Sequence, residues 1–579
     1  MDAARNEDIM LGMQSESESQ DIKLGTQSEP KSQDITLSME DESKSQVSQD
    51  SVIMDAGALS QGEEVNIYSF RNVGFLLQYF AVGTIYGGLP STIYGLFLGY
   101  LNVPGYVYAT AGVITTLPWS LKFVFGLLND CLPIRGYRRK PDMVIGWAVC
   151  AGVLICLSQV ALPEPYYCRD ERGSYDRIAQ PCNKAASEAG GPIAMLMCLA
   201  SLGYVIADVA ADGLMVEYAR REPASRRGTT QTTIYMVRSL GMFCAVMLVG
   251  LGMNGKEYNG TFNWSLSFPQ VCGILAIPAG MMIPCSWFLV REEPLEHGER
   301  QHLSTYLRGA WDLLTSRAFF FVVMYQFWEP FIGRISTTAG GLVKKEWAGV
   351  QVLQQQIFTL VSLCCFSFGL YQVKRRLLHC SWRKMLFVST ILINVVDSFF
   401  SFLTIFDVVR NQYFYLGETI LDDIPAATNF VVSTFIIVEM AEEGNEGLVY
   451  GLLTTISNLG TPFSRAVGNQ IFSLFDPDLS AAANYVADTP SFRKTVALSF
   501  GVSYAFSFVS MLCLFFLPSQ KTEAQRRRKE WPKHPAYGVI TLSLLFVALC
   551  YSLTVNFMTM VPTTACLKFV GGPGCEESE

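Results

Sequence analysis

The stretch Gly203–Arg220 reads GYVIADVAADGLMVEYAR and closes an apolar segment, 192–219, that is long enough to cross a bilayer. On a helix Asp208 and Asp212 share one face because they are four residues apart, and Glu217 follows about one turn later. An ionisable side chain at the centre of a spanning helix costs about 2.5–3.5 kcal/mol, so these carboxylates must face water, a ligand or a partner charge. They either pair with basic residues that lock helices together or line a polar path through the membrane, and we favour the path.

Composition places the chain among the polytopic helical membrane proteins. It has 579 residues, of which 50% are hydrophobic and only 16% are charged. The formal net charge of −8 is uneven, because residues 1–65 contain 15 acidic and 4 basic side chains. The 16 cysteines form no CxxC pair and the four histidines are far apart, so we expect no metal site and no cofactor.

Residues 1–65 predict a disordered, acidic cytoplasmic tail. The region is rich in Ser, Gln, Glu and Asp and has no aromatic residue, so it cannot bury enough apolar surface to fold alone. It lacks the basic start and the apolar core of a signal peptide.

Twelve apolar segments of spanning length follow in two groups of six, and a thirteenth stands alone. We place the spans at 71–99, 104–128, 141–163, 192–219, 228–253, 268–290, 318–340, 350–373, 384–406, 411–439, 447–475, 495–517 and 537–562. The predicted units are an N-terminal six-helix bundle (66–290), a central cytoplasmic connection (291–317), a C-terminal six-helix bundle (318–517), a basic cytoplasmic linker (518–536), and an extra transmembrane helix with an outer tail (537–579).

Lysine and arginine set the predicted orientation. The connections after the second, fourth, sixth and eighth segments and the 518–536 linker are all basic, so the rule that positive loops stay inside makes their side, and the N-terminus, cytoplasmic. The acidic connection at 440–446 is an exception. The segment 537–562 either spans or lies in the interface, and its near-absence of charge favours spanning.

The opposite side of the membrane carries two kinds of candidate modification. Cys168 with Cys182, and Cys566 with Cys575, would meet an oxidising compartment there and could form disulfides.

Two glycosylation sequons begin at Asn259 and Asn263 on the same side, close to the membrane.

A charged loop joins the second and third segments. It reads GLLNDCLPIRGYRRKP from Gly126 to Pro141, with Asp130 at the end of one helix and Arg138 and Arg139 at the start of the next. Such a pattern can form a charge latch at the cytoplasmic rim, and it resembles the signature loop of the major facilitator superfamily. At the same rim, Glu217 and Arg220 of the fourth segment are further candidates for a gate latch.

Other motifs narrow the resemblance to the folate–biopterin transporter family. They are PWSLK at Pro118–Lys122, DVAAD at Asp208–Asp212, VEYAR at Val216–Arg220, EGNEGLVY at Glu443–Tyr450, and Cys566 with GGPGC at Gly571–Cys575. The resemblance covers about 70–575, and one departure is that Met440 begins MAEEG where many members have Cys-Pro-x-Gly. It implies an all-α polytopic membrane protein with 6+6 major-facilitator bundles plus an extra C-terminal transmembrane helix. It also implies alternating access, with folates or pterins as cargo.

Carboxylates in the spans suit that cargo. A pterin ring has a guanidine-like edge that a carboxylate binds through paired hydrogen bonds. Asp208 and Asp212 are the candidates from the first bundle, with Asp397 and Asp422 or Asp423 as partners from the second.

Buried cations would hold the glutamyl carboxylates of a folate. Lys122, Arg238, Arg334 and Arg465 lie inside or near apolar segments. Trp119 could stack on the flat heterocycle, although most aromatic residues in such a chain serve packing or interface anchoring.

The sequence therefore predicts a secondary active transporter that works as a monomer on a small molecule, most simply in the plasma membrane. The absence of a GxxxxGK[ST] loop from the sequence predicts that energy comes from a gradient, which we take to be protons carried by Asp208, Asp212 or Asp397. The alternatives are a transporter of the same fold for another small solute and a non-transporting membrane receptor. We expect no enzyme activity, because no nucleophile–base pair or metal set can be assembled, and no nucleic-acid partner.

Overall fold

The computed structural model describes residues 67–169, 175–176, 180–221, 229–294, 303–377, 379–440 and 446–575. The predicted N-terminal tail, 1–65, lies outside these residues, as do parts of the connections that set the predicted orientation.

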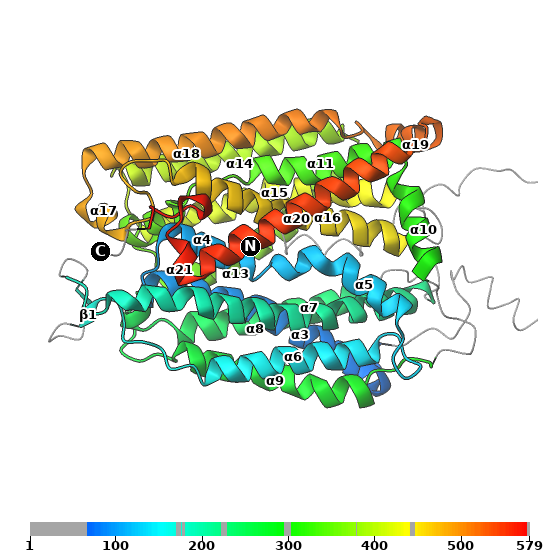
Figure 1. The fold of residues 1–579 in the computed structure, drawn as a ribbon, viewed down its shortest axis with the longest axis horizontal. Coiled ribbons are helices and arrows are strands. Elements are labelled where there is room, and N and C mark those ends of the chain that lie inside the picture. Colours follow the sequence, from blue (N-terminus) through cyan, green and yellow to red (C-terminus); the bar gives the residue numbers. More distant parts are fainter. Residues whose placement is uncertain are drawn as a thin grey trace, which may run out of the picture.

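Long helices lie side by side in two layers, with the first half of the chain in one layer and the second half in the other (Figure 1). The first half consists of η1 (Phe70–Asn72), α3 (Val73–Ile93), η2 (Tyr94–Tyr100), α4 (Gly105–Ile114), η3 (Leu117–Leu121), α5 (Lys122–Cys131), α6 (Lys140–Ser158), β1 (Cys168–Arg169), β2 (Tyr175–Asp176), η4 (Lys184–Ala189), α7 (Gly190–Arg220), α8 (Thr229–Gly252), η6 (Lys256–Tyr258) and α9 (Phe268–Phe288). Strands β1 and β2 pair antiparallel in a short hairpin.

The second half begins with a short helix that crosses the end of the bundle. Its elements are α10 (Leu303–Leu314), α11 (Arg317–Gly333), α12 (Gly340–Leu342), η7 (Val343–Trp347), α13 (Val352–Gln372), η8 (Val373–Leu377), α14 (Trp382–Ile405), α15 (Gln412–Met440), α16 (Glu446–Phe472), α17 (Ala482–Ala487), α18 (Pro490–Ser510) and η9 (Met511–Phe515). The chain then continues through α19 (Lys521–Glu530), α20 (Pro535–Met560), α21 (Pro562–Ala565) and η10 (Lys568–Val570).

Ten helices in the described residues are long and apolar enough to cross a membrane, or eleven if the bent pair Gly105–Ile114 and Leu117–Cys131 counts as one span. The predicted thirteenth segment is among the ten, as α20. The segments predicted at 318–340 and 447–475 are not among them. Helix α11 has only 17 residues, and α16 has 27 residues but many Gly, Ser, Thr and Asn side chains.

Glycines let the helices of the first half pack closely. A Cβ on Gly83 of α3 would lie 1.9 Å from the carbonyl oxygen of Arg238 on α8, so only glycine fits there. A Cβ on Gly146 of α6 would lie 2.6 Å from the carbonyl oxygen of Gly203 on α7. Proline does not interrupt α3, since the helix runs through Pro90 into the π-helix η2.

Both predicted disulfides are formed, Cys168–Cys182 beside the β hairpin and Cys566–Cys575 after α20. We call this end of the bundle the disulfide end. The opposite end, on the right of Figure 1, carries α10 and α19.

Hydrogen bonds join the two halves at the disulfide end. Tyr94 donates its hydroxyl to the carbonyl of Val350 at 2.6 Å, and the Lys345 ammonium donates to Asn102 at 3.0 Å. Nearer the other end, the backbone N–H of Phe123 donates to the Thr455 hydroxyl at 3.0 Å.

The extra helix α20 touches both halves. It packs along α16 and α11 of the second half and against α4 and α7 of the first, and it crosses the bundle diagonally in Figure 1. Its C-terminal end meets the first half closely, because a Cβ on Gly191 would lie 1.7 Å from the Met560 carbonyl oxygen. Beyond α20, the Tyr106 hydroxyl donates to the Ala565 carbonyl at 2.9 Å.

Candidate functional site

Four charged side chains meet in the middle of the first half, and we call them the α7 charge cluster: Lys122, Asp208, Asp212 and Arg238. The Lys122 Nζ lies 3.3 Å from Asp208 Oδ2 and 3.2 Å from Asp212 Oδ2. The Arg238 Nη1 lies 3.5 Å from Asp208 Oδ1. Two acids and two bases neutralise one another, which lowers the cost of holding charges inside the bundle.

The fold delivers each member from a different element. Asp208 and Asp212 lie on one face of α7 because they are one turn apart, while Lys122 begins α5 directly after the 3₁₀ turn η3 and Arg238 is halfway along α8. From α3, the Tyr79 hydroxyl donates to Asp212 Oδ1 at 3.0 Å.

Aromatic rings surround the two cations. The Lys122 ammonium lies 4.4 Å from the centroid of Trp119, and the Arg238 guanidinium lies 5.0 Å from that of Tyr86 and 5.4 Å from that of Trp119. The indole N–H of Trp119 donates to the Tyr204 hydroxyl at 3.1 Å, which fixes the ring. Cation–π contacts of this kind are strongest where water is excluded.

The two aspartates are not equivalent. The side chain of Asp208 is 0% exposed and sealed against Lys122 and Arg238, so it matches the interpretation in which a carboxylate locks helices together. Asp212 is 22% exposed and shares Lys122 with Asp208. Asp212 and Lys122 are therefore the members that a ligand could reach with the least rearrangement.

The predicted carboxylates of the second half contact other groups. Asp423 is buried and accepts a hydrogen bond from Ser362, and Asp397 accepts one from Ser401 at 2.9 Å. Asp397 also interacts electrostatically with Glu418 of α15.

Sequence reasoning missed Glu418, although its position four residues before Asp422 on α15 is a usable signal. Asp422, the remaining candidate, lies one turn away on the same helix.

Two arginines of the second half lie where α11 ends beside α16. The Arg334 Nη1 donates to the Thr461 hydroxyl at 2.6 Å. Arg465 donates to the carbonyl and the hydroxyl of Ser336, at 3.3 and 3.0 Å. Both side chains are half-buried.

The predicted gate latch forms through Arg139. The Arg139 Nη2 lies 2.7 Å from Asp130 Oδ1 and 3.8 Å from Glu217 Oε1, so Arg139 bridges the two acids. Arg220 was also predicted to belong to the latch, but its side chain lies outside the described part of the structure.

Glu292 completes this latch and was not expected from the sequence. Its carboxylate accepts the backbone N–H groups of Arg138, Arg139 and Lys140 at 2.8–2.9 Å, where α6 begins. An acid at a helix N-terminus satisfies donors that have no partner within the helix.

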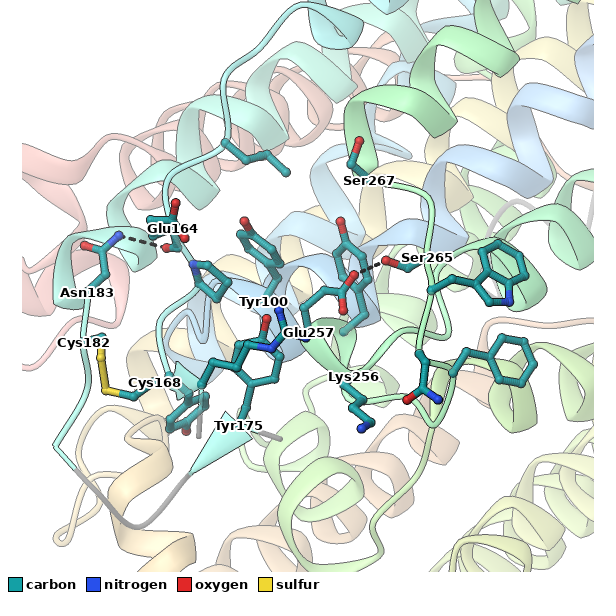
Figure 2. Close-up of a pocket in the computed structure, with 18 of the residues that line it drawn as sticks. Tyr100, Glu164, Cys168, Tyr175, Cys182, Asn183, Lys256, Glu257, Ser265 and Ser267 are labelled. Carbon is teal, nitrogen blue, oxygen red and sulfur yellow. Dashed lines mark hydrogen bonds between the residues drawn. A yellow bond between two sulfur atoms is a disulfide. The ribbon is translucent and has the colours of Figure 1, made fainter. Parts of the chain in front are cut away.

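A cavity of about 1250 Å³ opens among the loops of the first half at the disulfide end, away from the α7 charge cluster (Figure 2). Tyr100, Tyr258 and Glu257 line it, and the Cys168–Cys182 disulfide lies at one side. Of the predicted residues it includes Cys168, Cys182 and Asn263. These loops offer no periodic pattern from which the sequence could have predicted a cavity.

Comparison with known proteins confirms the resemblance drawn from the motifs. The model of the BT1 family matches residues 85–164. A "Folate-biopterin transporter" of Synechocystis sp. is 22% identical over 424 residues, which are 70% of this chain and 75% of that protein. A "Probable folate-biopterin transporter 4" of Arabidopsis thaliana is 24% identical over 181 residues, which are 31% of this chain and only 30% of that protein.

The fold is that of solved membrane transporters. A bacterial homologue of the human lysosomal transporter Spinster, in an inward-facing and occupied conformation, superposes with a TM-score of 0.51. The sequences are 11% identical, and the superposition covers 80% of this chain and 99% of the other. The predicted all-α, major-facilitator fold is therefore confirmed.

Proposed function

The chain is a multi-pass membrane protein of the major facilitator fold that resembles the folate–biopterin transporters, and we propose that it is a secondary transporter of a folate or a pterin. The observation that carries this proposal is the α7 charge cluster. Carboxylates are kept at mid-depth in the bundle, and one of them, Asp212, stays partly exposed beside a lysine.

The cluster supports an exchange of partners. The guanidine-like edge of a pterin presents paired N–H donors that suit the Asp212 carboxylate. When Asp212 binds the pterin, its ion pair with Lys122 would weaken. The Lys122 ammonium would still lie close to Asp208, from which it is 3.3 Å away. Trp119 would offer its indole to the flat ring, because it already lies against both cations.

Alternating access would pass the cargo between the two halves. The 3₁₀ turn η3, which carries Trp119 and leads into Lys122, packs against α16 of the second half. A rocking motion of one half on the other would therefore act directly on the cluster.

We further propose that protons drive uptake and that the protein acts as a monomer in the plasma membrane with its N-terminus in the cytoplasm. The proximity of two acids inside the second half, Asp397 and Glu418, supports a group there that could carry a proton. The two disulfides support an oxidising compartment at the disulfide end.

Uptake by proteoliposomes that contain the purified chain tests the proposal. We expect labelled folate or biopterin to accumulate when the outside is made more acidic than the inside, and empty liposomes serve as the control. Competition by unlabelled nucleosides and amino-acid-derived cofactors, with no effect of pterins, would indicate another solute. Binding without any accumulation would overturn the transporter proposal in favour of a receptor.

A further inference from the structure

Arg334 and Arg465 lie close together on one face of the second half. Thr461, which accepts from Arg334, and Arg465 are four residues apart on α16, so the two guanidinium groups approach the same face of that helix within about one turn. Arg465 reaches back to Ser336, just beyond the end of α11.

The first half of the chain faces this arginine pair. Helix α4 packs on α16, and Tyr108 of α4 interacts electrostatically with Arg465. The ring of Tyr108 reaches across to Gly341, where an added Cβ would lie 2.5 Å from it. The pair therefore lies at the contact between the two halves rather than against lipid.

No carboxylate of the described residues lies within ion-pair distance of either arginine. The acid that interacts with Arg334 electrostatically is Glu329 on α11, and the described residues show no ion pair between the two. Hydroxyls and one carbonyl satisfy part of the two guanidinium groups, and the buried Nε of Arg465 has no hydrogen-bond partner. Two guanidinium groups thus lie together inside the bundle, and the one acid that acts on them, Glu329, stays beyond ion-pair distance of Arg334 in the described residues.

The basic residues of the first half are in the opposite situation. Lys122 and Arg238 are both within 3.5 Å of aspartate oxygens, so their charge is already neutralised. A negatively charged ligand gains more from the arginine pair than from the α7 charge cluster.

We propose that Arg334 and Arg465 form a subsite for the carboxylates of the cargo. A guanidinium is a planar fork that binds a carboxylate through two parallel hydrogen bonds. The inference rests on the proposed function and narrows it: the cargo is an anionic folate with a glutamyl tail, and an uncharged pterin such as biopterin binds without this contact. The α7 charge cluster and the arginine pair would hold the two ends of one molecule, since η3 and α4 both pack on α16.

Equilibrium dialysis of the purified full chain tests the subsite with three probes: folate, a folate diester without tail charge, and biopterin. We expect Arg465→Gln and Arg334→Gln each to raise the Kd for folate at least tenfold and to change the Kd for the diester and biopterin less than twofold. Arg465→Lys keeps the charge but not the fork and should give an intermediate value. The matched control is Arg375→Gln, an exposed arginine of η8 whose guanidinium donates only to Tyr371 in the described contacts.

The outcomes separate the two proposals. An equal loss of affinity for all three probes, equal binding of folate and its diester by the unchanged chain, or no folate binding at all would overturn the subsite. Folate uptake that survives both substitutions would leave the transporter standing and remove the subsite. If folate binding depends on the arginines but no uptake occurs, the subsite stands and the transporter proposal is overturned. Elution from a sizing column and the melting temperature of each variant show whether a lost affinity reflects misfolding.

Discussion

Replacing Lys122 by Met tests whether the α7 charge cluster holds the first half together. The Lys122 ammonium lies 3.3 and 3.2 Å from carboxylates of Asp208 and Asp212. At an effective dielectric constant of about 20, each contact supplies roughly 5 kcal/mol of attraction before desolvation is subtracted. Breaking a buried pair by removing one partner costs about 3–5 kcal/mol.

The expected loss lies at the lower end of that range. Arg238 remains 3.5 Å from Asp208, while Asp212 keeps its hydrogen bond from Tyr79 and is already 22% exposed to solvent. We therefore expect Lys122→Met to lower the free energy of unfolding by about 3 kcal/mol. The double variant with Asp212→Asn should regain at least half of this, because it removes a carboxylate that has lost its cation.

Titration of the purified protein with SDS, followed by tryptophan fluorescence, measures this free energy. The control is Lys384→Met, an exposed lysine of α14, which should change it by less than about 0.5 kcal/mol. A loss below about 1 kcal/mol for Lys122→Met, or a double variant no more stable than the single one, would refute the electrostatic reasoning.

Three further predictions concern other parts of the molecule. Asp212→Asn should abolish folate and pterin uptake while the amount of protein in the membrane stays unchanged; normal uptake would remove this residue from the site. At the disulfide end, burial raises the pKa of Asp488, but hydrogen bonds and charges from Arg410 and Arg493 outweigh it and hold the pKa at about 2, below the ordinary 3.8. Stability from this group is therefore present above pH 4 and lost as the pH falls toward 2, so melting curves of Asp488→Asn should differ from those of the unchanged chain at pH 5 and converge with them near pH 2. In a eukaryotic host we expect glycosylation at Asn263, whose side chain is exposed, and not at Asn259, whose amide donates to the Val350 carbonyl at 3.3 Å. Glycosidase treatment should therefore shift the gel band of Asn259→Gln but not that of Asn263→Gln. The opposite pattern would contradict the structure.

The sequence predicts the helices better than their mutual contacts. Hydropathy and helix length locate the extra span at 537–562, and α20 occupies Pro535–Met560. These signals are local, because each helix satisfies its own backbone. They fail for α11, where irregular chain follows Gly333 at a position that an apolar run of residues does not reveal.

Which charged side chains form ion pairs depends on how one helix is rotated against another, and a single sequence does not contain this information. The four-residue spacing gave the shared face of Asp208 and Asp212, but not that Asp208 would be sealed and Asp212 exposed. Adjacent Arg138 and Arg139 look equivalent in the sequence, yet only a view of the helix ends shows that Arg139 points at Asp130.

Glu292 illustrates the same limit at longer range. It was part of a connection with no assigned role, and its carboxylate caps a helix more than 150 residues earlier in the chain.

Helix α20 makes the two flanks of the seam between the halves unequal. On one flank it lies over α4, α7, α11 and α16, while on the other α8 and α13 meet without it. A lipid that approaches sideways from the covered flank meets α20 before it meets the seam. The C-terminal end of α20 packs beside Gly191 of the first half, and the helix packs along α16 of the second half. If one half tilts against the other, α20 must therefore shift relative to Gly191 or to α16. The two flanks of the seam therefore differ in how directly the surrounding lipid reaches them.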